Sequence, residues 1–288
     1  MVRLSAENTA VVLDSTADLA DPQARHSNWR LVPLYVRFGD ETFREYVDIS
    51  AEDFYRRLRE SSQPPKSSQP SPADFQEVFE SLGNYERILC VVLSSKISGT
   101  YESARLAAEP AGERVQVIDS GVTSGGTVIL ADAIQRRLDR GTEEKEIDGL
   151  VERFKRERGL LFTVDTLEYL IRGGRIGKAA GLAGQLLSVK PILVLDDGEV
   201  AALKRVRGRK KAIAEMERLF VEGSQDGSGL HVGVAHADAQ QDCDELAGRV
   251  RAARPHASLD LVLTLGPVIG THGGPGTLGL FWFQDDSG

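Results

Sequence analysis

The sequence has few of the residues on which several protein classes depend. Only two of its 288 residues are cysteine, Cys90 in an apolar run and Cys243 in a polar helical stretch. Two cysteines are too few for a disulfide framework, so both are expected to be reduced thiols. No stretch of about 20 apolar residues could span a membrane, and no long apolar core follows Arg3 at the N-terminus. These absences predict a cytoplasmic protein.

The chain also lacks a surplus of positive charge and several catalytic motifs. Its formal net charge of −8 and sequence pI near 5.3 argue against binding to nucleic acid, which depends on excess Lys and Arg. There is no P-loop, no G-x-S-x-G elbow and no close cluster of metal-ligating residues. Gly274 to Gly279 matches G-x-G-x-x-G, but too little chain follows for a dinucleotide fold. Phosphoryl transfer by this chain alone is therefore unsupported.

Apolar runs alternate with helical patterns in the first half, which predicts a Rossmann-like α/β domain with a parallel sheet over residues 1–158. The expected strands are Val11 to Leu13, Leu31 to Val36, Ile88 to Leu93 and Val115 to Ile118. The expected helices are Ala51 to Arg59, Ser98 to Ala108, Gly126 to Arg140 and Glu144 to Arg158. Four prolines and five serines make Ser61 to Pro72 an expected extended loop.

The pattern changes after Gly159 and predicts a second α/β domain over residues 159–288, with a mixed or antiparallel sheet. A hairpin is expected to turn at Asp197-Gly198. The expected strands are Leu160 to Val164, Ile192 to Leu195, Val200 to Leu203, Val232 to Ala235 and Leu259 to Leu265. The expected helices are Lys210 to Phe220 and Gln240 to Ala253, before a Gly-rich end at Gly266 to Gly279.

Two polar segments follow strands of the first domain, at the carboxyl ends where open α/β sheets bind ligands. These segments are Asp14 to Leu19 and Ser94 to Thr100. In the first, an N-cap by Ser15 or Thr16 is the alternative to a ligand site. The second holds more hydroxyls than one cap needs, so capping and anion binding both stay open.

Three further side chains are candidates for binding. Ser67 lies in the Pro-rich loop and could close over a ligand, although a solvated linker explains it as well. Arg175 follows a Gly-Gly stop of a helix expected to start at Asp165; a guanidinium with apolar neighbours favours a carboxylate partner, and helix punctuation is the alternative. His272 lies among glycines, where a lone histidine can also be purely structural.

A basic stretch from Lys204 to Lys211 stands out in this acidic chain. Such a run can be a solvated helix start. Its crowding of positive charges also suits a docking surface for an acidic partner.

Taken in order, a set of short segments carries a family resemblance over nearly the whole chain. They are Asp14-Ser-Thr-Ala-Asp-Leu, Val32-Pro-Leu, Ser67-Ser-Gln-Pro-Ser, Ser94-Ser-Lys-Ile-Ser-Gly-Thr-Tyr, Val117-Ile-Asp-Ser, Arg172-Gly-Gly-Arg-Ile, Val189-Lys-Pro-Ile and Gly266-Pro-Val-Ile-Gly-Thr-His-Gly. This ordered set resembles the DegV family.

The resemblance implies a protein without catalysis or cofactor of its own. It would bind one long-chain fatty acid, such as palmitate, in a tunnel between two α/β domains. It would present the carboxylate to an ATP-dependent fatty acid kinase for acyl-phosphate formation, within phospholipid metabolism. Ser98, Ser67, His272 and Arg175 would surround the carboxylate, and Arg207 would lie where the kinase docks. Many members have Thr where this chain has Ser67, so the hydroxyl is kept and a methyl is lost.

Two other functions remain as alternatives. A stand-alone serine hydrolase would use Ser98 as nucleophile, His272 as base and Asp14 or Asp119 as the orienting acid. A regulator would bind nucleic acid through the basic stretch in a salt-sensitive manner.

Overall fold

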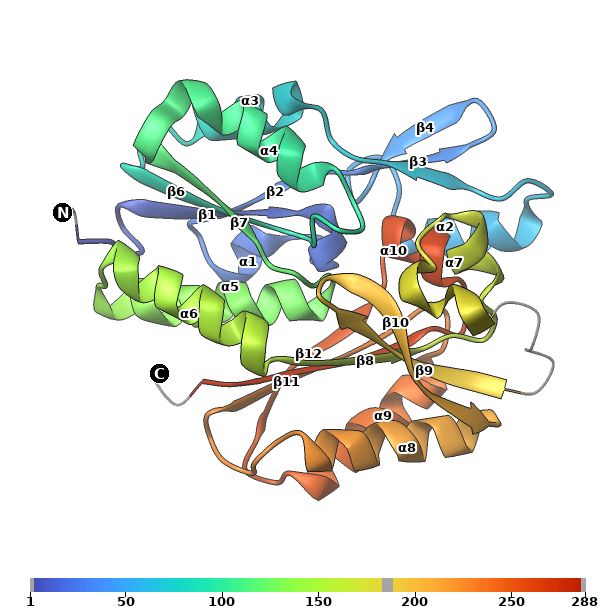
Figure 1. The fold of residues 1–288 in the computed structure, drawn as a ribbon. Coiled ribbons are helices and arrows are strands. Elements are labelled where there is room, and N and C mark those ends of the chain that lie inside the picture. Colours follow the sequence, from blue (N-terminus) through green and yellow to red (C-terminus); the bar gives the residue numbers. More distant parts are fainter. Residues whose placement is uncertain (1–2, 183–188, 286–288) are drawn as a thin grey trace.

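Two larger β-sheets lie one above the other, with a layer of helices between them and further helices on the outer face of each (Figure 1). The computed structural model describes residues 3–182 and 189–285. A smaller third sheet lies to one side of these layers.

The first sheet has four parallel strands in the order β2-β1-β6-β7. These are β1 (Thr9–Asp14), β2 (Trp29–Val32), β6 (Arg87–Val92) and β7 (Val115–Asp119). The helices are α3 (Pro72–Ser81) and α4 (Thr100–Ala108) on the outer face, and α1 (Pro22–Arg25), α5 (Gly125–Arg140) and α6 (Glu144–Glu157) on the inner face. Val12 and Cys90 pack in the outer core, and Val11 and Leu89 in the inner one. Burial of both faces explains why these strands are continuously apolar.

The second sheet is mixed, with the order β10-β9-β8-β13-β11-β12 and only β11 and β12 parallel. Its strands are β8 (Gly159–Thr163), β9 (Val189–Asp196), β10 (Glu199–Arg207), β11 (Leu230–His236), β12 (Ser258–Thr264) and β13 (Leu278–Gln284). Its outer face is covered by α8 (Arg209–Glu222) and α9 (Gln240–Ala253). On its inner face, the ring of Phe283 lies 5.0 Å from that of Phe154 on α6. The helices between the sheets therefore pack against both sheets.

The third sheet has the order β4-β3-β5 and is antiparallel. It consists of β3 (Tyr35–Phe38), β4 (Glu41–Arg44) and β5 (Lys66–Ser68). Nearby helices are α2 (Ala51–Glu60), α7 (Glu168–Arg172) and α10 (Pro267–Gly273). Helix α10 contacts α2, α7, β3 and β5. Segments that are distant in the sequence therefore meet beside the small sheet.

Prolines explain two departures from the expected elements. The run Leu31 to Val36 is not one strand, since Pro33 separates β2 from β3. The segment Ser61 to Pro72 is not a loop throughout. After Pro64 and Pro65 it forms β5, in which Ser67 lies opposite Val36 of β3.

Three other expectations were wrong or incomplete. The Gly-rich end contains α10 and runs into β13, a central strand of the second sheet that was not predicted from the sequence. The helix expected from Ser98 begins at Thr100, because the Ser98 side chain bonds to that residue instead of continuing the helix. The helix expected from Asp165 begins at Glu168.

The predicted fold class is confirmed, with a parallel sheet in the first half and a mixed sheet in the second. The hairpin at Asp197-Gly198 is also confirmed, and both residues have the positive φ of a tight two-residue turn. The boundary between residues 158 and 159 stays a prediction. It falls between α6 and β8, while the inner core runs through both halves.

Candidate functional site

A cavity of about 350 Å³ lies between the loops of the first sheet and the inner face of the second. Its walls are mostly apolar, with Leu160, Phe162 and Phe281 from the second sheet and Leu93 and Leu265 from strand ends. This volume and lining are typical of a site for an apolar ligand.

The cavity brings together all four side chains predicted to bind a carboxylate. Ser67 comes from β5, Ser98 from the loop before α4, Arg175 from the loop after α7, and His272 from α10. They are far apart in the sequence, and all four line the same cavity.

Ser67 and His272 form a hydrogen-bonded pair, with 2.7 Å between Oγ and Nε2. The other ring nitrogen, Nδ1, is buried and has no hydrogen-bond partner within the described chain. Burial, assisted by the nearby positive charge of Arg175, lowers the pKa of His272 to about 4. At neutral pH the ring is therefore uncharged and holds the Ser67 hydroxyl in place.

Arg175 is exposed at the edge of the cavity and is held by backbone carbonyls. Its Nε donates to the oxygen of Ile97 at 3.1 Å, and its Nη1 to that of Gly173 at 2.8 Å. These bonds fix the guanidinium beside the segment that carries Ser98. Helix punctuation alone would not require this placement.

Ser98 makes local hydrogen bonds to Thr100 and also lines the cavity, while the N-cap position of α4 is Gly99. Its Oγ lies 2.8 Å from the Thr100 hydroxyl and accepts a hydrogen bond from the Thr100 amide at 3.2 Å. Ser98 and Arg175 line both the cavity and a polar surface hollow that Lys96 also lines. A ligand group at Ser98 would thus lie close to the surface.

The geometry gives the serine hydrolase no support. His272 bonds to Ser67, and neither proposed acid orients its ring. Asp14 instead accepts hydrogen bonds from Thr16 and from the Leu93 amide. Asp119 accepts from the amides of Ser95 and Gly121.

A buried acidic cluster, which was not predicted from the sequence, anchors the helix that carries His272. Asp18 accepts from the Gly266 amide and Glu45 from the Val268 amide, both at 2.7 Å, at the start of α10. Burial raises the pKa of Asp18 to about 7, and burial together with Asp18 raises the pKa of Glu45. Asp18 belongs to the Asp14 to Leu19 motif, but no local pattern marks Glu45.

The segment Asp14 to Leu19 does not have the N-cap by Ser15 or Thr16 that was the alternative to a ligand site. Asp14, not Ser15 or Thr16, caps the 3₁₀ turn Ser15–Ala17 by accepting from the Thr16 amide. The Ser15 hydroxyl bonds to Glu45 and accepts from the Leu34 amide.

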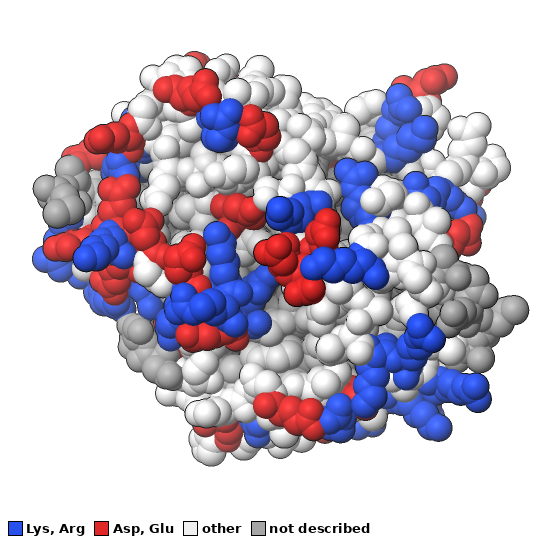
Figure 2. Space-filling model, viewed as in Figure 1, with Lys and Arg blue, Asp and Glu red and all other residues white. Residues whose placement is uncertain are grey.

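Arg207 lies outside the cavity, at the end of the edge strand β10, and is exposed. Exposed Lys and Arg side chains gather on the side of the molecule where β9 and β10 lie (Figure 2). Within the basic stretch, Arg209 is half-buried and donates to Asp242 at 2.7 Å, and the exposed Lys204 donates to Glu215 at 2.8 Å. The basic stretch is therefore shared by two elements: Lys204, Arg205 and Arg207 lie on β10, and Arg209, Lys210 and Lys211 begin α8.

The part of the chain that the structure describes holds neither a metal-binding cluster nor a membrane-spanning helix. Over residues 3–182 and 189–285, no group of three His, Cys, Asp or Glu side chains could hold a metal ion. Within the same residues, no helix has the length and apolarity needed to cross a membrane.

Comparisons with known proteins agree over almost the whole chain. A family model described as "Uncharacterised protein, DegV family" matches residues 8–285. A DegV domain-containing protein of Halalkalibacterium halodurans is 37% identical over 278 residues, covering 95% of this chain and 98% of that protein. A fatty acid-binding protein of Thermotoga maritima is 35% identical over 277 residues, or 93% of this chain and 95% of that protein. The structure of a DegV family protein from Thermus thermophilus, described for its fatty acid binding, has a TM-score of 0.90 at 35% identity, covering 96% of this chain and 99% of that one.

Proposed function

The chain belongs to the DegV family, and from this premise we propose that it binds one long-chain fatty acid in the cavity and presents the carboxylate to an ATP-dependent fatty acid kinase. The observation that carries the proposal is one apolar cavity with Ser67, Ser98, Arg175 and His272 along its wall. Relatives at 35% identity are named for fatty acid binding, which supports the same ligand class here.

The energetics suit such a ligand. Each buried methylene contributes about 0.8 kcal/mol, so a tail of palmitate length supplies on the order of 10 kcal/mol before ordering costs. The apolar walls receive this tail. The carboxylate, costly to bury alone, would accept hydrogen bonds from Ser67 and Ser98 beside the charge of Arg175.

We further propose that the chain is a carrier without catalysis or cofactor, acting in the cytoplasm in phospholipid metabolism. Ser98 and Arg175 line both the cavity and the outer hollow, so a carboxylate held there would be within reach of an enzyme docked outside. Arg207, on the exposed basic strand, is the proposed docking contact.

The ligand can be tested on protein purified from cells. Native mass spectrometry followed by lipid extraction should find about one fatty acid per chain, because an apolar cavity is poorly solvated when empty. Delipidation should lower the melting temperature. No extracted acyl chain, together with a melting curve insensitive to added fatty acid, would refute the carrier function.

The site residues can be tested by Ser98→Ala and His272→Ala. Each change should weaken fatty acid binding by roughly 1–3 kcal/mol, because Ser98→Ala removes a donor to the carboxylate and His272→Ala removes the partner that positions the Ser67 hydroxyl. Binding titrations should include Ser81→Ala, on the surface of α3, as a control that keeps wild-type affinity. Wild-type affinity in the Ser98/His272 double variant would mean that the carboxylate binds elsewhere.

A further inference from the structure

A polar hollow lies at the surface, directly beside the proposed carboxylate site. Its volume is about 360 Å³, and Ser98 and Arg175 line both this hollow and the apolar cavity. Lys96 and Glu199 add two further charged side chains to its wall, and its lining includes three glycines. The hollow therefore adjoins the cavity at the two residues proposed to hold the carboxylate.

Local contacts fix the position of Lys96 in this wall. The Lys96 amide donates to Oγ of Ser94 at 3.2 Å, and this buried hydroxyl donates to the carbonyl of Gly198 at 2.9 Å. Gly198 belongs to the turn between β9 and β10, and the stem of Lys96 lies against it. A Cβ added at Gly198 would come within 3.1 Å of Cγ of Lys96. The charged end of Lys96 therefore starts from a segment that is held on the second sheet.

Two positive charges line the hollow without an acidic partner in the described part of the chain. Arg175 donates to the carbonyl oxygens of Ile97 and Gly173 and pairs with no carboxylate there. The Lys96 ammonium makes no hydrogen bond or ion pair within the same residues. Glu199 is the one acidic side chain that the described residues contribute to the lining, and it pairs with neither cation. An anion in the hollow would give both cations a partner.

The chemistry of the proposed reaction places an anion at this point. A carboxylate oxygen bonds to the γ-phosphorus of ATP held by the kinase, while the bond from this phosphorus to the ADP oxygen breaks and ADP leaves. No proton moves, because the carboxylate is already ionised at neutral pH. The acyl chain occupies the apolar side of the carboxylate, so the new phosphoryl group lies on the side of the hollow. It has three acceptor oxygens and carries more negative charge than the carboxylate.

We propose that the hollow is a phosphate subsite, in which Lys96 acts with Arg175 to bind the phosphoryl group of the acyl phosphate. The phosphorylated ligand is then bound more tightly than the free fatty acid, and the reactive anhydride stays on the carrier. This inference rests on the proposed fatty acid function and names a residue that distinguishes the product from the substrate.

The test compares two ligands on the delipidated wild-type protein at neutral pH and low salt. One is hexadecanoic acid, and the other is 2-oxoheptadecylphosphonic acid, in which a methylene replaces the bridging oxygen of the acyl phosphate and prevents hydrolysis. Competition against a fluorescent fatty acid gives both dissociation constants. The phosphonate should bind roughly tenfold more tightly, the effect of an added charge-assisted hydrogen bond. Equal or weaker binding of the phosphonate would overturn the inference.

Variants then assign the residues. Lys96→Met keeps an unbranched stem and removes the charge, so it should lower the affinity for the phosphonate roughly tenfold and that for hexadecanoic acid much less. Glu199→Gln removes the acidic side chain of the hollow and should change the ratio of the two affinities in the opposite direction. Lys145→Met, at an exposed position of α6, is the matched control and should keep the wild-type ratio.

Two negative results have different meanings. A wild-type ratio that persists in Lys96→Met, or an equal loss of both ligands there, would overturn the phosphate subsite and leave the proposed function intact. If the wild-type protein binds neither ligand, the proposed function itself fails.

Discussion

Gly173 lies against the ring of His272 and leaves no room for a side chain. A Cβ at this position would come within 2.1 Å of Nδ1 of His272 and 3.1 Å of the Tyr169 carbonyl. The glycine that reads in the sequence as a helix stop therefore also sets the position of the histidine that bonds to Ser67.

Gly173→Ala should displace the His272 ring and break its bond to Ser67. We expect fatty acid affinity to fall roughly tenfold, the effect of losing one or two buried hydrogen bonds. The control is Gly149→Ala in α6, where a Cβ meets nothing within 4 Å. That change should preserve binding and stabilise the helix by about 1 kcal/mol. Equal affinities in both variants, measured by lipid titration, would contradict this role for Gly173.

Asp18 predicts a pH dependence of stability with a definite sign. Burial raises its pKa from 3.8 to about 7, so the folded protein binds this proton more tightly than the unfolded chain. The resulting stabilisation is complete below about pH 4 and is lost as the pH rises through 7. Asp14 and Glu45, whose pKa values are also raised, contribute in the same direction.

Asp18→Asn should remove much of the loss of stability at high pH, because an amide does not ionise. Its oxygen can still accept the hydrogen bond from the Gly266 amide. The variant should gain melting temperature relative to the wild type at pH 8, by roughly 2–4 °C for each kcal/mol. At pH 4 that advantage should disappear. Scanning calorimetry at both pH values tests this, and a difference independent of pH would contradict it.

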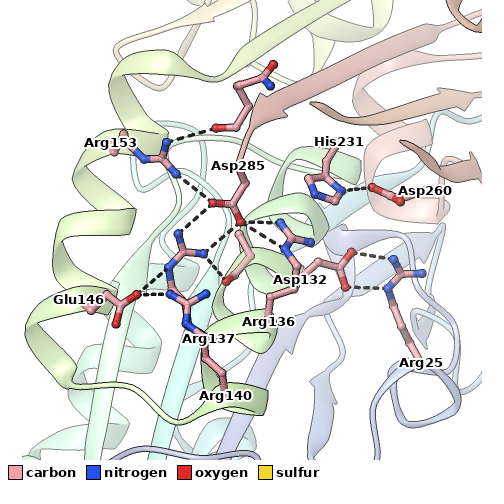
Figure 3. Close-up of polar contacts among 12 residues, drawn as sticks. Arg25, Asp132, Arg136, Arg137, Arg140, Glu146, Arg153, His231, Asp260 and Asp285 are labelled. Carbon is pink, nitrogen blue, oxygen red and sulfur yellow. Dashed lines mark hydrogen bonds and ion pairs between the residues drawn. The ribbon is translucent and has the colours of Figure 1, made fainter. Parts of the chain in front are cut away.

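At the level of elements, Asp285 joins the end of β13 to the two helices between the sheets. Figure 3 shows Arg136 and Arg137 of α5 and Arg153 of α6 pointing at its carboxylate. Burial alone would raise the pKa of Asp285, but the hydrogen bonds from Arg137 and Arg136 hold it well below its usual range. The guanidinium of Arg153 also lies 4.9 Å from the ring centroid of Phe283. The last strand is thus fixed to the helix layer by charge and by packing.

Asp285→Asn should destabilise the protein by about 3–5 kcal/mol, because it leaves the buried Arg137 without its carboxylate and removes the partner of the half-buried Arg136 and Arg153. Because the pKa of Asp285 is lowered in the folded protein, the stability that its carboxylate provides is lost as the pH falls. The difference in stability between wild type and Asp285→Asn should therefore shrink in acid. Urea unfolding at neutral and acidic pH measures both effects. Asp226→Asn, which alters a surface pair with His256, should change little. A loss no larger than that of the surface variant would show that the arginine cluster does not depend on Asp285.

At the scale of the whole molecule, the ligand cavity and the basic surface are separate. The cavity lies between the two sheets, whereas Arg207 ends the exposed edge strand β10 and does not line it. The proposed binding of lipid and the proposed binding of a partner can therefore be altered independently.

If the chain serves the proposed kinase, Arg207→Ala should slow acyl phosphorylation while fatty acid affinity stays intact, because a rim charge mainly affects association. Added salt should weaken the wild-type reaction in the same way. Acyl-phosphate formation against carrier concentration, at two ionic strengths, tests this beside a lipid titration. Arg156→Ala, an exposed change on α6, serves as the control. Equal loss of lipid binding and turnover would place Arg207 at the ligand site.

Local signals account for most of the elements that were predicted. The buried strands around Val11 and Leu89 are continuous apolar runs, and the turn at Asp197-Gly198 has residues that tolerate positive φ. β5 gave little local signal, because it follows two prolines. β13 was missed although Leu280 to Phe283 is an apolar, aromatic run typical of a buried strand, because the Gly-rich segment before it suggests the end of the regular structure.

By itself, the sequence determined the α/β class and, through the order of its motifs, the family and four candidate side chains. The tertiary structure alone decided that these side chains share a cavity. Ser67 and His272 are 205 positions apart, and the Gly266 amide lies 248 positions from the Asp18 carboxylate that holds it. Hydrophobic periodicity and turn chemistry act over a few residues and are legible in a sequence. Pairing between distant side chains depends on how the sheets and helices pack together, which no short stretch of sequence encodes.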